Sequence, residues 1–301
     1  MSEQADARVA LSVLVPVKNE AANLRDCLAG VSFAEEIVVV DSASTDATQA
    51  IAEESGARVV QFGWNGKFPR KKNWALENVR WQHEWVLIVD ADERITPELE
   101  REIRRAIRRT DVDGFYLNRR FWFLGGWINY CGYFPSWNLR LFRHRLGRYE
   151  EIGIDDNILS GDNEVHEHLL LNGRTEYLTA PMEHYAFPDI ATFVEKHNRY
   201  STWEAAAFGK LHERAGEKTL RATPFGTAVE RKRWLRKLAT RVPFRPSLRF
   251  LYHYVWKQGF RDGYRGWVLC RLLAWYERMI LLKEREMKKR PATGQRDFVK
   301  L

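Results

Sequence analysis

The sequence is poor in cysteine, and its N-terminus lacks the features of a secretion signal. The 301 residues include three cysteines, Cys27, Cys131 and Cys270, which lie far apart and form no C-x-x-C motif. This spacing argues against a zinc site and against an extracellular fold held by disulfides. Residues 1–8 are polar and partly acidic, without the basic start and apolar stretch of a signal peptide. We therefore expect a cytoplasmic protein.

Acidic residues are scarce at the C-terminal end, where the positive charge is concentrated. The formal net charge is +8, but residues 226–301 hold 20 Lys or Arg against 6 Asp or Glu, and residues 1–225 hold 28 against 34. A polybasic segment indicates contact either with nucleic acid or with an anionic membrane.

No apolar run in this basic region is long enough to cross a bilayer. Residues 267–282 are apolar but interrupted by charged residues, so they fall short of the roughly 20 uninterrupted residues that a transmembrane helix needs. Residues 230–241 place cations around Trp234 and two leucines at helical spacing, which is typical of interfacial anchors. The central cations of this segment are Arg231, Lys232, Arg233, Arg236 and Lys237. We predict that residues 226–301 form a helical appendage on an anionic membrane; a helical cap on the sheet is the alternative.

Residues 8–225 alternate short apolar runs with helical patterns. Runs of strand length are Val9–Val17, Glu36–Asp41, Ala57–Phe62 and Glu84–Asp90. Helical patterns occur at Glu20–Ala29, Thr45–Glu54, Lys71–Val79 and Pro97–Arg109. Such alternation predicts βαβ units and an α/β fold with a mostly parallel sheet. We expect further strands at Gly114–Leu124 and Ser136–Arg143, and a helix at Phe193–Phe208.

One apolar run ends in two carboxylates, Asp90 and Asp92. On an extended backbone these side chains would share one side, and hard oxygen ligands so placed suit Mg²⁺ or Mn²⁺ bridging to a diphosphate. Acidic pairs after strands often serve only as turn or cap residues. Here Thr96 and Pro97 already provide the cap and first residue of the next helix. The pair therefore indicates a metal site.

Polar residues also follow the other predicted parallel strands. Lys18-Asn19-Glu20 come after the first strand, and Asp41 ends the second. In such sheets ligands bind beyond the carboxyl ends of the strands. Helix capping is the plainer explanation, and it suits Thr45 better than Asp41, which precedes the cap. We expect these residues to lie in one pocket with the two carboxylates.

Four motifs in this order resemble those of family 2 glycosyltransferases of the GT-A fold: Val15–Glu20, Val38–Thr48, Lys72-Asn73 and Asp90–Glu93. Lys72 stands where arginine is common, which keeps the charge but loses the bidentate fork. The second half resembles the WaaE/KdtX-type lipopolysaccharide core glucosyltransferases. The segments that carry this second resemblance are Trp137–Arg143, Val165–Glu167, His184-Tyr185, Lys196 and Asn198–Tyr200.

The resemblance implies a GT-A domain over residues 8–225 and inverting transfer of a hexose from a nucleotide sugar, with UDP as the first choice of nucleotide. The acceptor would be a hydroxyl of a lipid-linked glycan such as lipopolysaccharide core, at the cytoplasmic face of the inner membrane. Donor-binding residues would be Pro16, Lys18, Glu20, Asp41, Lys72 and Asp90. A divalent metal, Mg²⁺ or Mn²⁺, would be held by Asp90, Asp92 and His184, because charge grows on the leaving diphosphate.

A hydroxyl nucleophile also needs a general base, and one carboxylate on the acceptor side suffices for inverting transfer. Glu167, flanked by two histidines, is our candidate. Glu164, Asp155 and Asp156 are the reserves, and His166 competes with His184 as a metal ligand. The aromatic segment Leu124–Trp137 is either a packed hairpin or a wall for the acceptor sugar.

Other functions leave signals that are weak or missing here. Transfer to polyprenyl phosphate or to a protein is the alternative within enzymes, although polyprenyl-phosphate transferases usually carry transmembrane helices. A nucleotidyltransferase would need a glycine-rich loop after the first strand, and Lys18–Ala22 has no glycine. A nucleic-acid-binding protein could use the basic region, but aromatics at helical spacing and an acidic first domain argue against it. We expect a nucleotide sugar, a lipid-linked glycan and an anionic membrane as partners, and no nucleic acid.

Overall fold

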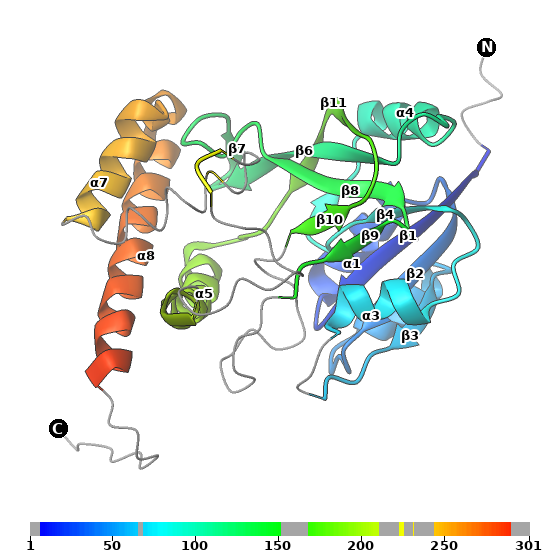
Figure 1. Cartoon of the computed structure of the whole chain (residues 1–301), viewed down its shortest axis with the longest axis horizontal. Coiled ribbons are helices and arrows are strands. Elements are labelled where there is room, and N and C mark those ends of the chain that lie inside the picture. The colour runs from blue at the N-terminus through cyan, green and yellow to red at the C-terminus, as the bar shows by residue number, and fades with distance from the viewer. Residues whose placement is uncertain are drawn as a thin grey trace.

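The chain folds into a large mixed sheet with helices on both faces and a helical group at one end (Figure 1). The structure is a computed structural model that describes residues 7–65, 69–151, 168–210, 223–225, 231 and 244–289. The large sheet has the strand order β3-β2-β1-β4-β8-β6-β11-β5, and β7 pairs with β6.

The first half alternates strands with helices, as the sequence predicts. In chain order the elements are β1 (Val9–Val17), α1 (Ala21–Gly30), β2 (Ala34–Asp41), α2 (Thr48–Glu54), β3 (Arg58–Gln61), α3 (Lys71–Asn78), β4 (Trp85–Ile88), β5 (Glu93–Arg94) and α4 (Pro97–Ala106). Strands β3, β2, β1 and β4 are mutually parallel. Thr96 caps α4 by accepting a hydrogen bond from the Leu99 N–H at 3.2 Å, as expected.

The second half extends this sheet with strands of mixed direction. Its strands are β6 (Gly114–Phe123), β7 (Gly126–Ile128), β8 (Trp137–Arg143), β9 (Gly147–Tyr149), β10 (Leu169–Leu171) and β11 (Thr175–His184). Strand β8 runs antiparallel to β4 and β6, whereas β11 runs parallel to β6. Strands β9 and β10 form a separate antiparallel pair. The fold is therefore a mixed α/β architecture in which the parallel part comes first.

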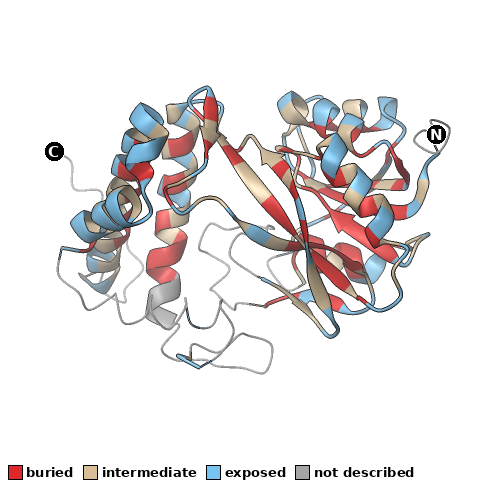
Figure 2. Cartoon of the chain, turned by 90° about the horizontal axis from the view of Figure 1, so that it is seen from above, coloured by how far each residue is buried: buried red, intermediate tan, exposed pale blue. Residues whose placement is uncertain are grey.

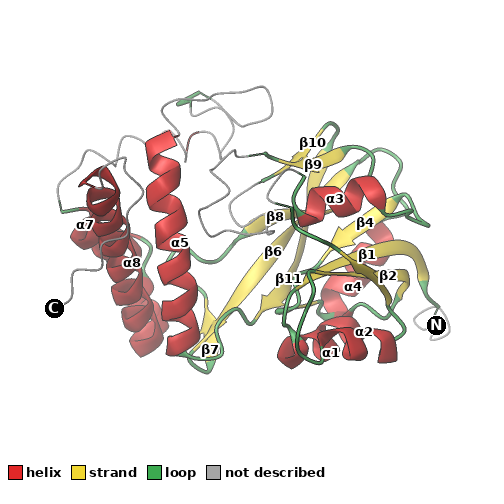
Figure 3. Ribbon diagram, turned by 90° about the horizontal axis from the view of Figure 1, so that it is seen from below, coloured by secondary structure: helices red, strands yellow, loops and turns green. Residues whose placement is uncertain are grey.

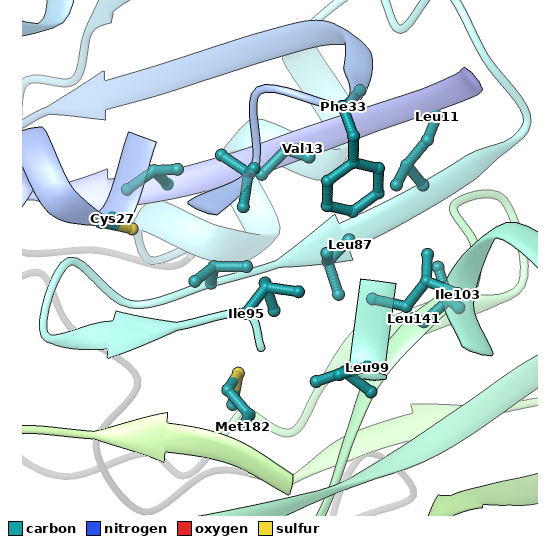
Figure 4. Packing of buried hydrophobic residues seen from close by; sticks show 14 of the residues in the cluster. Leu11, Val13, Cys27, Phe33, Leu87, Ile95, Leu99, Ile103, Leu141 and Met182 are labelled. Carbon is teal, nitrogen blue, oxygen red and sulfur yellow. The ribbon is translucent and has the colours of Figure 1, made fainter. Parts of the chain in front are cut away.

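Both faces of the sheet are covered, which explains the nearly continuous apolar sequence of β1. Val13 and Val15 belong to the cluster that includes residues of α1 and α4, and Leu14 belongs to the cluster formed with α3. Successive strand residues point to opposite faces, so a strand covered on both sides needs apolar residues throughout. Figure 4 shows Val13 and Leu87 packed with Leu99 in the first cluster.

The C-terminal helices pack beside the end of the sheet that carries β7 (Figure 3). They are α5 (Ile190–Lys210), α7 (Arg245–Leu251), the π-helical turn η1 (Tyr252–Trp256), the 3₁₀ turn η2 (Gly259–Asp262) and α8 (Gly263–Lys289). Phe121 and Phe123 of β6 join Phe193 of α5 and Leu269 of α8 in one buried cluster. Within the described ranges no helix is long and apolar enough to span a membrane. Of the predicted helix over residues 230–241, only Arg231 lies in the described part of the chain.

Candidate active site

The residues that follow β1, β2 and β4 lie at one edge of the sheet. Val17 stands opposite Asp41 in the parallel ladder of β1 and β2, and Leu14 stands opposite Ile88 in that of β1 and β4. The carboxyl ends of these strands therefore meet at one edge, which is where ligands bind in open α/β sheets.

The loops after β1 and β2 are tied together by hydrogen bonds. Asn19 has a positive φ of 56°, which asparagine adopts more readily than most residues. Its side-chain Oδ1 accepts a bond from the Thr45 N–H at 2.8 Å, and its own N–H donates to the Ser44 hydroxyl at 2.8 Å. The Glu20 N–H donates to the Thr48 hydroxyl at 2.8 Å. These hydrogen bonds therefore join the two loops into one edge.

The residues predicted to bind the donor have different surroundings in this edge. The buried Asp41 carboxylate accepts the Ser44 N–H and the Gln61 side-chain amide, the latter at 3.0 Å, so it stabilises its own loop. Lys18 is exposed and Pro16 is half-buried. Burial raises the pKa of Glu20, whose carboxylate accepts the Asn23 amide at 3.0 Å. Contact of these four residues with the donor stays a prediction.

Two cations flank the Asp90 carboxylate. Lys72 Nζ lies 3.1 Å from Oδ1, and Arg140 Nη2 lies 2.6 Å from Oδ2. Burial alone would raise the pKa of Asp90, but the charges of Arg140 and Lys72 outweigh it and hold the pKa well below its usual range. Asp90 is therefore a carboxylate anion fixed between two positive groups.

Asp90 and Asp92 lie on a turn, and the expectation of an extended strand is wrong here. Strand β4 ends at Ile88, and the Glu93 N–H donates to the Asp90 carbonyl at 2.9 Å. The physical reason is Glu93, whose fully buried carboxylate accepts the Asp90 N–H at 2.8 Å and pairs with Arg140 at 3.1 Å. These contacts draw the chain back on itself immediately after Asp90.

The turn brings Asp92 to residues from the second half of the chain. Asp92 Oδ1 lies 3.5 Å from His184 Nε2 at the end of β11, and Asp92 Oδ2 lies 3.9 Å from Lys196 Nζ on α5. Burial would raise the pKa of Asp92, but His184 and its hydrogen bond outweigh burial and keep that pKa below its ordinary value. The structure thus places two of the three predicted metal ligands side by side.

The side chains around Asp92 are chemically suited to bind a divalent metal. The third predicted ligand, Asp90, is paired with Lys72 and Arg140. No three His, Cys, Asp or Glu side chains converge as a ready-made metal site among the residues that the structure describes. Carboxylate and imidazole groups are both ligands of divalent metals, and here Asp92 Oδ1 and His184 Nε2 lie 3.5 Å apart as an ion pair. Asp90 would join them from its ion-paired position. The three roles stay predictions.

Sequence reasoning missed Arg140 and Glu93. Arg140 falls in the Trp137–Arg143 segment, whose pattern indicates no role for it, and the pattern around Glu93 indicates only the end of the acidic motif. A signal was present, because Arg140 stands between Leu139 and Leu141 in an otherwise apolar strand centre. An arginine there must find buried anions. Its Nη1 atom is buried and has no hydrogen-bond partner among the described residues.

The candidate general base lies outside the described residues. Glu167 falls in the range 152–167, together with the reserves Glu164, Asp155 and Asp156 and the competing ligand His166. The chain is described on either side of this range, where the His168 N–H donates to Glu150 at 3.0 Å.

Comparison with known proteins supplies the family. The model of "Glycosyl transferase family 2" matches residues 12–161. The lipopolysaccharide core biosynthesis glycosyltransferase LpsC of Rhizobium meliloti (strain 1021) is 30% identical over 210 residues, which cover 66% of this chain and 71% of LpsC. A protein of Rickettsia bellii (strain RML369-C) named "Uncharacterized glycosyltransferase" is 39% identical over 106 residues, and the match spans only 35% of either chain.

The solved structures that resemble the chain are more distant. The mannosyltransferase PcManGT from Pyrobaculum calidifontis, in complex with GDP-Man and Mn²⁺, has 14% sequence identity and a TM-score of 0.46, with 95% of this chain and 89% of that chain covered. S. aureus TarS 1-349 in complex with UDP-GlcNAc has 15% identity and a TM-score of 0.43, with 95% and 93% covered.

The α/β fold and the family match define a glycosyltransferase with the GT-A architecture. The chain belongs to glycosyltransferase family 2.

We predict that Arg140→Met destabilises the fold by up to about 3–5 kcal/mol, because among the described residues the fully buried Glu93 keeps only its longer ion pair with Arg119, at 3.4 Å, and Asp90 keeps only that with Lys72. Adding Glu93→Gln should recover part of this loss. Urea unfolding of both single variants and the double variant measures the coupling between the two residues. Arg143→Met is the matched control on the same strand, because its carboxylate partners, Glu84 and Asp113, are not fully buried as Glu93 is.

The stability that the Asp90 ion pairs contribute should decrease at low pH. The pKa of Asp90 in the folded chain lies below its unfolded value of about 3.9. Its ion pairs therefore contribute stability above that pH and lose it as the pH falls through the folded pKa. The difference in unfolding free energy between wild type and Arg140→Met should become smaller below about pH 4.

Strictly additive effects of Arg140→Met and Glu93→Gln on the unfolding free energy at pH 7 would contradict coupling between Arg140 and Glu93.

Proposed function

We propose that this enzyme transfers a hexose, with inversion, from a UDP-linked sugar to a hydroxyl of a lipid-linked glycan such as lipopolysaccharide core. The observation that carries the proposal is the pairing of Asp92 with His184 beside Asp90, which Lys72 and Arg140 hold from the other side. The proposed metal ligands and two fixed cations thus lie at the carboxyl edge of the parallel strands.

This arrangement suits a reaction in which a nucleoside diphosphate leaves. Negative charge grows on the leaving group, and preorganised positive groups stabilise it more strongly at a buried site than in water. A divalent cation held by Asp92, His184 and Asp90 would neutralise diphosphate oxygens. Lys72 is almost fully buried, and its Nζ also lies 5.4 Å from the centre of the Tyr149 ring. It is therefore a fixed positive charge beside the Asp90 carboxylate.

The acceptor is proposed from similarity and from charge. LpsC carries the name of a lipopolysaccharide core biosynthesis glycosyltransferase, which favours a lipid-linked glycan over polyprenyl phosphate or a protein. The basic C-terminal region suits an enzyme that works at the cytoplasmic face of the inner membrane. We assign the general base to Glu167, which would accept the proton of the attacking hydroxyl.

Asp92→Asn should lower turnover by about 100-fold or more, because it removes a metal ligand and leaves the buried turn intact. The assay is release of UDP from UDP-sugars with and without Mn²⁺, run beside GDP-, dTDP- and CMP-sugars. Asp111→Asn is the control, because Asp111 pairs with Arg109 away from the site. Chelation with EDTA should reproduce the loss in the wild type, and full activity in EDTA would contradict metal dependence.

Glu167→Gln should lower turnover by about 10²–10⁴-fold while donor affinity stays unchanged, because a general base acts on the acceptor alone. Donor affinity is measured by titration with UDP-sugar, and turnover by product formation. If Glu167→Gln keeps full activity and Asp155→Asn or Asp156→Asn is inactive, the base is one of the reserve residues.

A further inference from the structure

The outward side of the helix formed by α7 and η1 is apolar. Leu248, Leu251, Tyr252, Val255 and Trp256 are between 46% and 78% exposed. Their spacing of three and four residues places them along one side of a helix. We call these five residues the outer stripe. A surface helix of a globular protein normally presents polar residues here.

The opposite side of the same helix supplies the contacts that hold it in place. Phe250 and Tyr254 pack against the cluster that contains Leu269 and Leu273 of α8. Arg245 and Arg249 pair with Glu277 of α8, the former at 2.5 Å. These inward contacts hold the helix against α8 through residues outside the outer stripe.

Aromatic residues with the same character continue into η2 and α8. Phe260, Tyr264 and Trp267 are between 43% and 74% exposed. The rings of Tyr264 and Trp267 stack with centroids 6.2 Å apart, and the Arg271 guanidinium lies 5.7 Å from the Trp267 ring. Figure 2 shows exposed residues along the outer sides of the helical group opposite the N-terminus.

The charge around these residues is almost entirely positive. Between Phe244 and Trp275 the sequence has six Lys or Arg residues and one acidic residue, Asp262. Asp262 is engaged inward, because it accepts the N–H groups of Asn129 at 3.0 Å and Tyr130 at 2.9 Å. Exposed cations therefore stand beside the apolar residues without an exposed anion in this segment: Lys257, Arg261, Arg265 and Arg271.

We infer that residues 248–267 dock the enzyme on an anionic lipid bilayer, with the outer stripe in the interfacial region and the cations against lipid phosphates. Tyr and Trp with neighbouring Lys and Arg are the composition of such contacts. A second copy of the chain fits less well, because a symmetric contact would bring like charges together. The inference rests on the proposed function, because an enzyme whose acceptor is linked to a lipid must work at the membrane surface.

The surface differs from the cationic helix predicted for residues 230–241. That helix combines its five central cations with Trp234 and two leucines, and salt screens the attraction of its cations to lipid phosphates. The outer stripe adds burial of apolar side chains, which salt does not weaken in this way. Binding should therefore fall with salt but persist in part.

The test is co-sedimentation of the full chain with vesicles of phosphatidylglycerol and phosphatidylcholine, and with vesicles of phosphatidylcholine alone. Wild type should bind the anionic vesicles. The triple variant Leu251→Ser/Val255→Ser/Trp256→Ser should partition at least about tenfold less. The control Leu146→Ser/Tyr177→Ser removes exposed apolar residues that lie outside the C-terminal helices and should bind like wild type. Urea unfolding verifies that each variant is folded.

Two results would overturn the inference: a folded triple variant that binds as tightly as wild type, or a wild type that ignores anionic vesicles. A wild-type dimer that the triple variant converts to monomer, with no vesicle binding by either, assigns the stripe to contact between copies. UDP release from UDP-sugar is measured in parallel. Vesicle binding without UDP release would contradict the proposed function but not the docking surface. UDP release without vesicle binding would contradict the docking surface but not the proposed function.

Discussion

The ion pairs of Arg140 with Asp90 and Glu93 are the interaction on which the candidate site depends. Glu93 is fully buried, and a carboxylate there needs a cation close by. Once Glu93 is held, it accepts the Asp90 N–H and closes the turn. The closed turn directs Asp92 toward His184, 3.5 Å away. A buried arginine on β8 thus sets the position of a carboxylate that it does not contact.

The first turn of α3 connects this network to the rest of the edge through three consecutive residues. Lys71 donates to the Val17 carbonyl at the end of β1, at 2.8 Å. Lys72 pairs with Asp90. The Asn73 side chain bonds both the N–H and the C=O of Tyr149, at 2.8 and 2.9 Å. One helix turn therefore holds the end of β1, places a positive charge beside Asp90 and anchors β9.

The sequence predicts the fold of the first half well, because strands buried on both faces read as apolar runs and the polar residues cluster at their ends. The gathering of Glu20, Asp41 and Asp90 at one edge follows from parallel strand order alone. The turn at Asp90–Glu93 could not be predicted from the sequence. The local sequence pattern indicates only that a carboxylate after a strand is exposed to solvent or binds a metal. The conformation of the turn depends on Arg140, which is 50 residues away and reaches the site through the antiparallel pairing of β8 with β4. The outer stripe was missed for a related reason, since periodicity marks an apolar side without saying whether it faces the core.

We propose that Asp90, Asp92 and His184 together hold the metal, and that Lys72 and Arg140 balance the charge of Asp90. The most direct measurement is a crystal structure of the enzyme with UDP and Mn²⁺, with the metal located by its anomalous scattering. We expect the manganese peak at coordination distance, about 2 Å, from Asp90, Asp92 and His184, with the diphosphate on the side of Lys72. A manganese peak away from Asp92, or bound UDP without manganese at this edge of the sheet, would contradict this proposal.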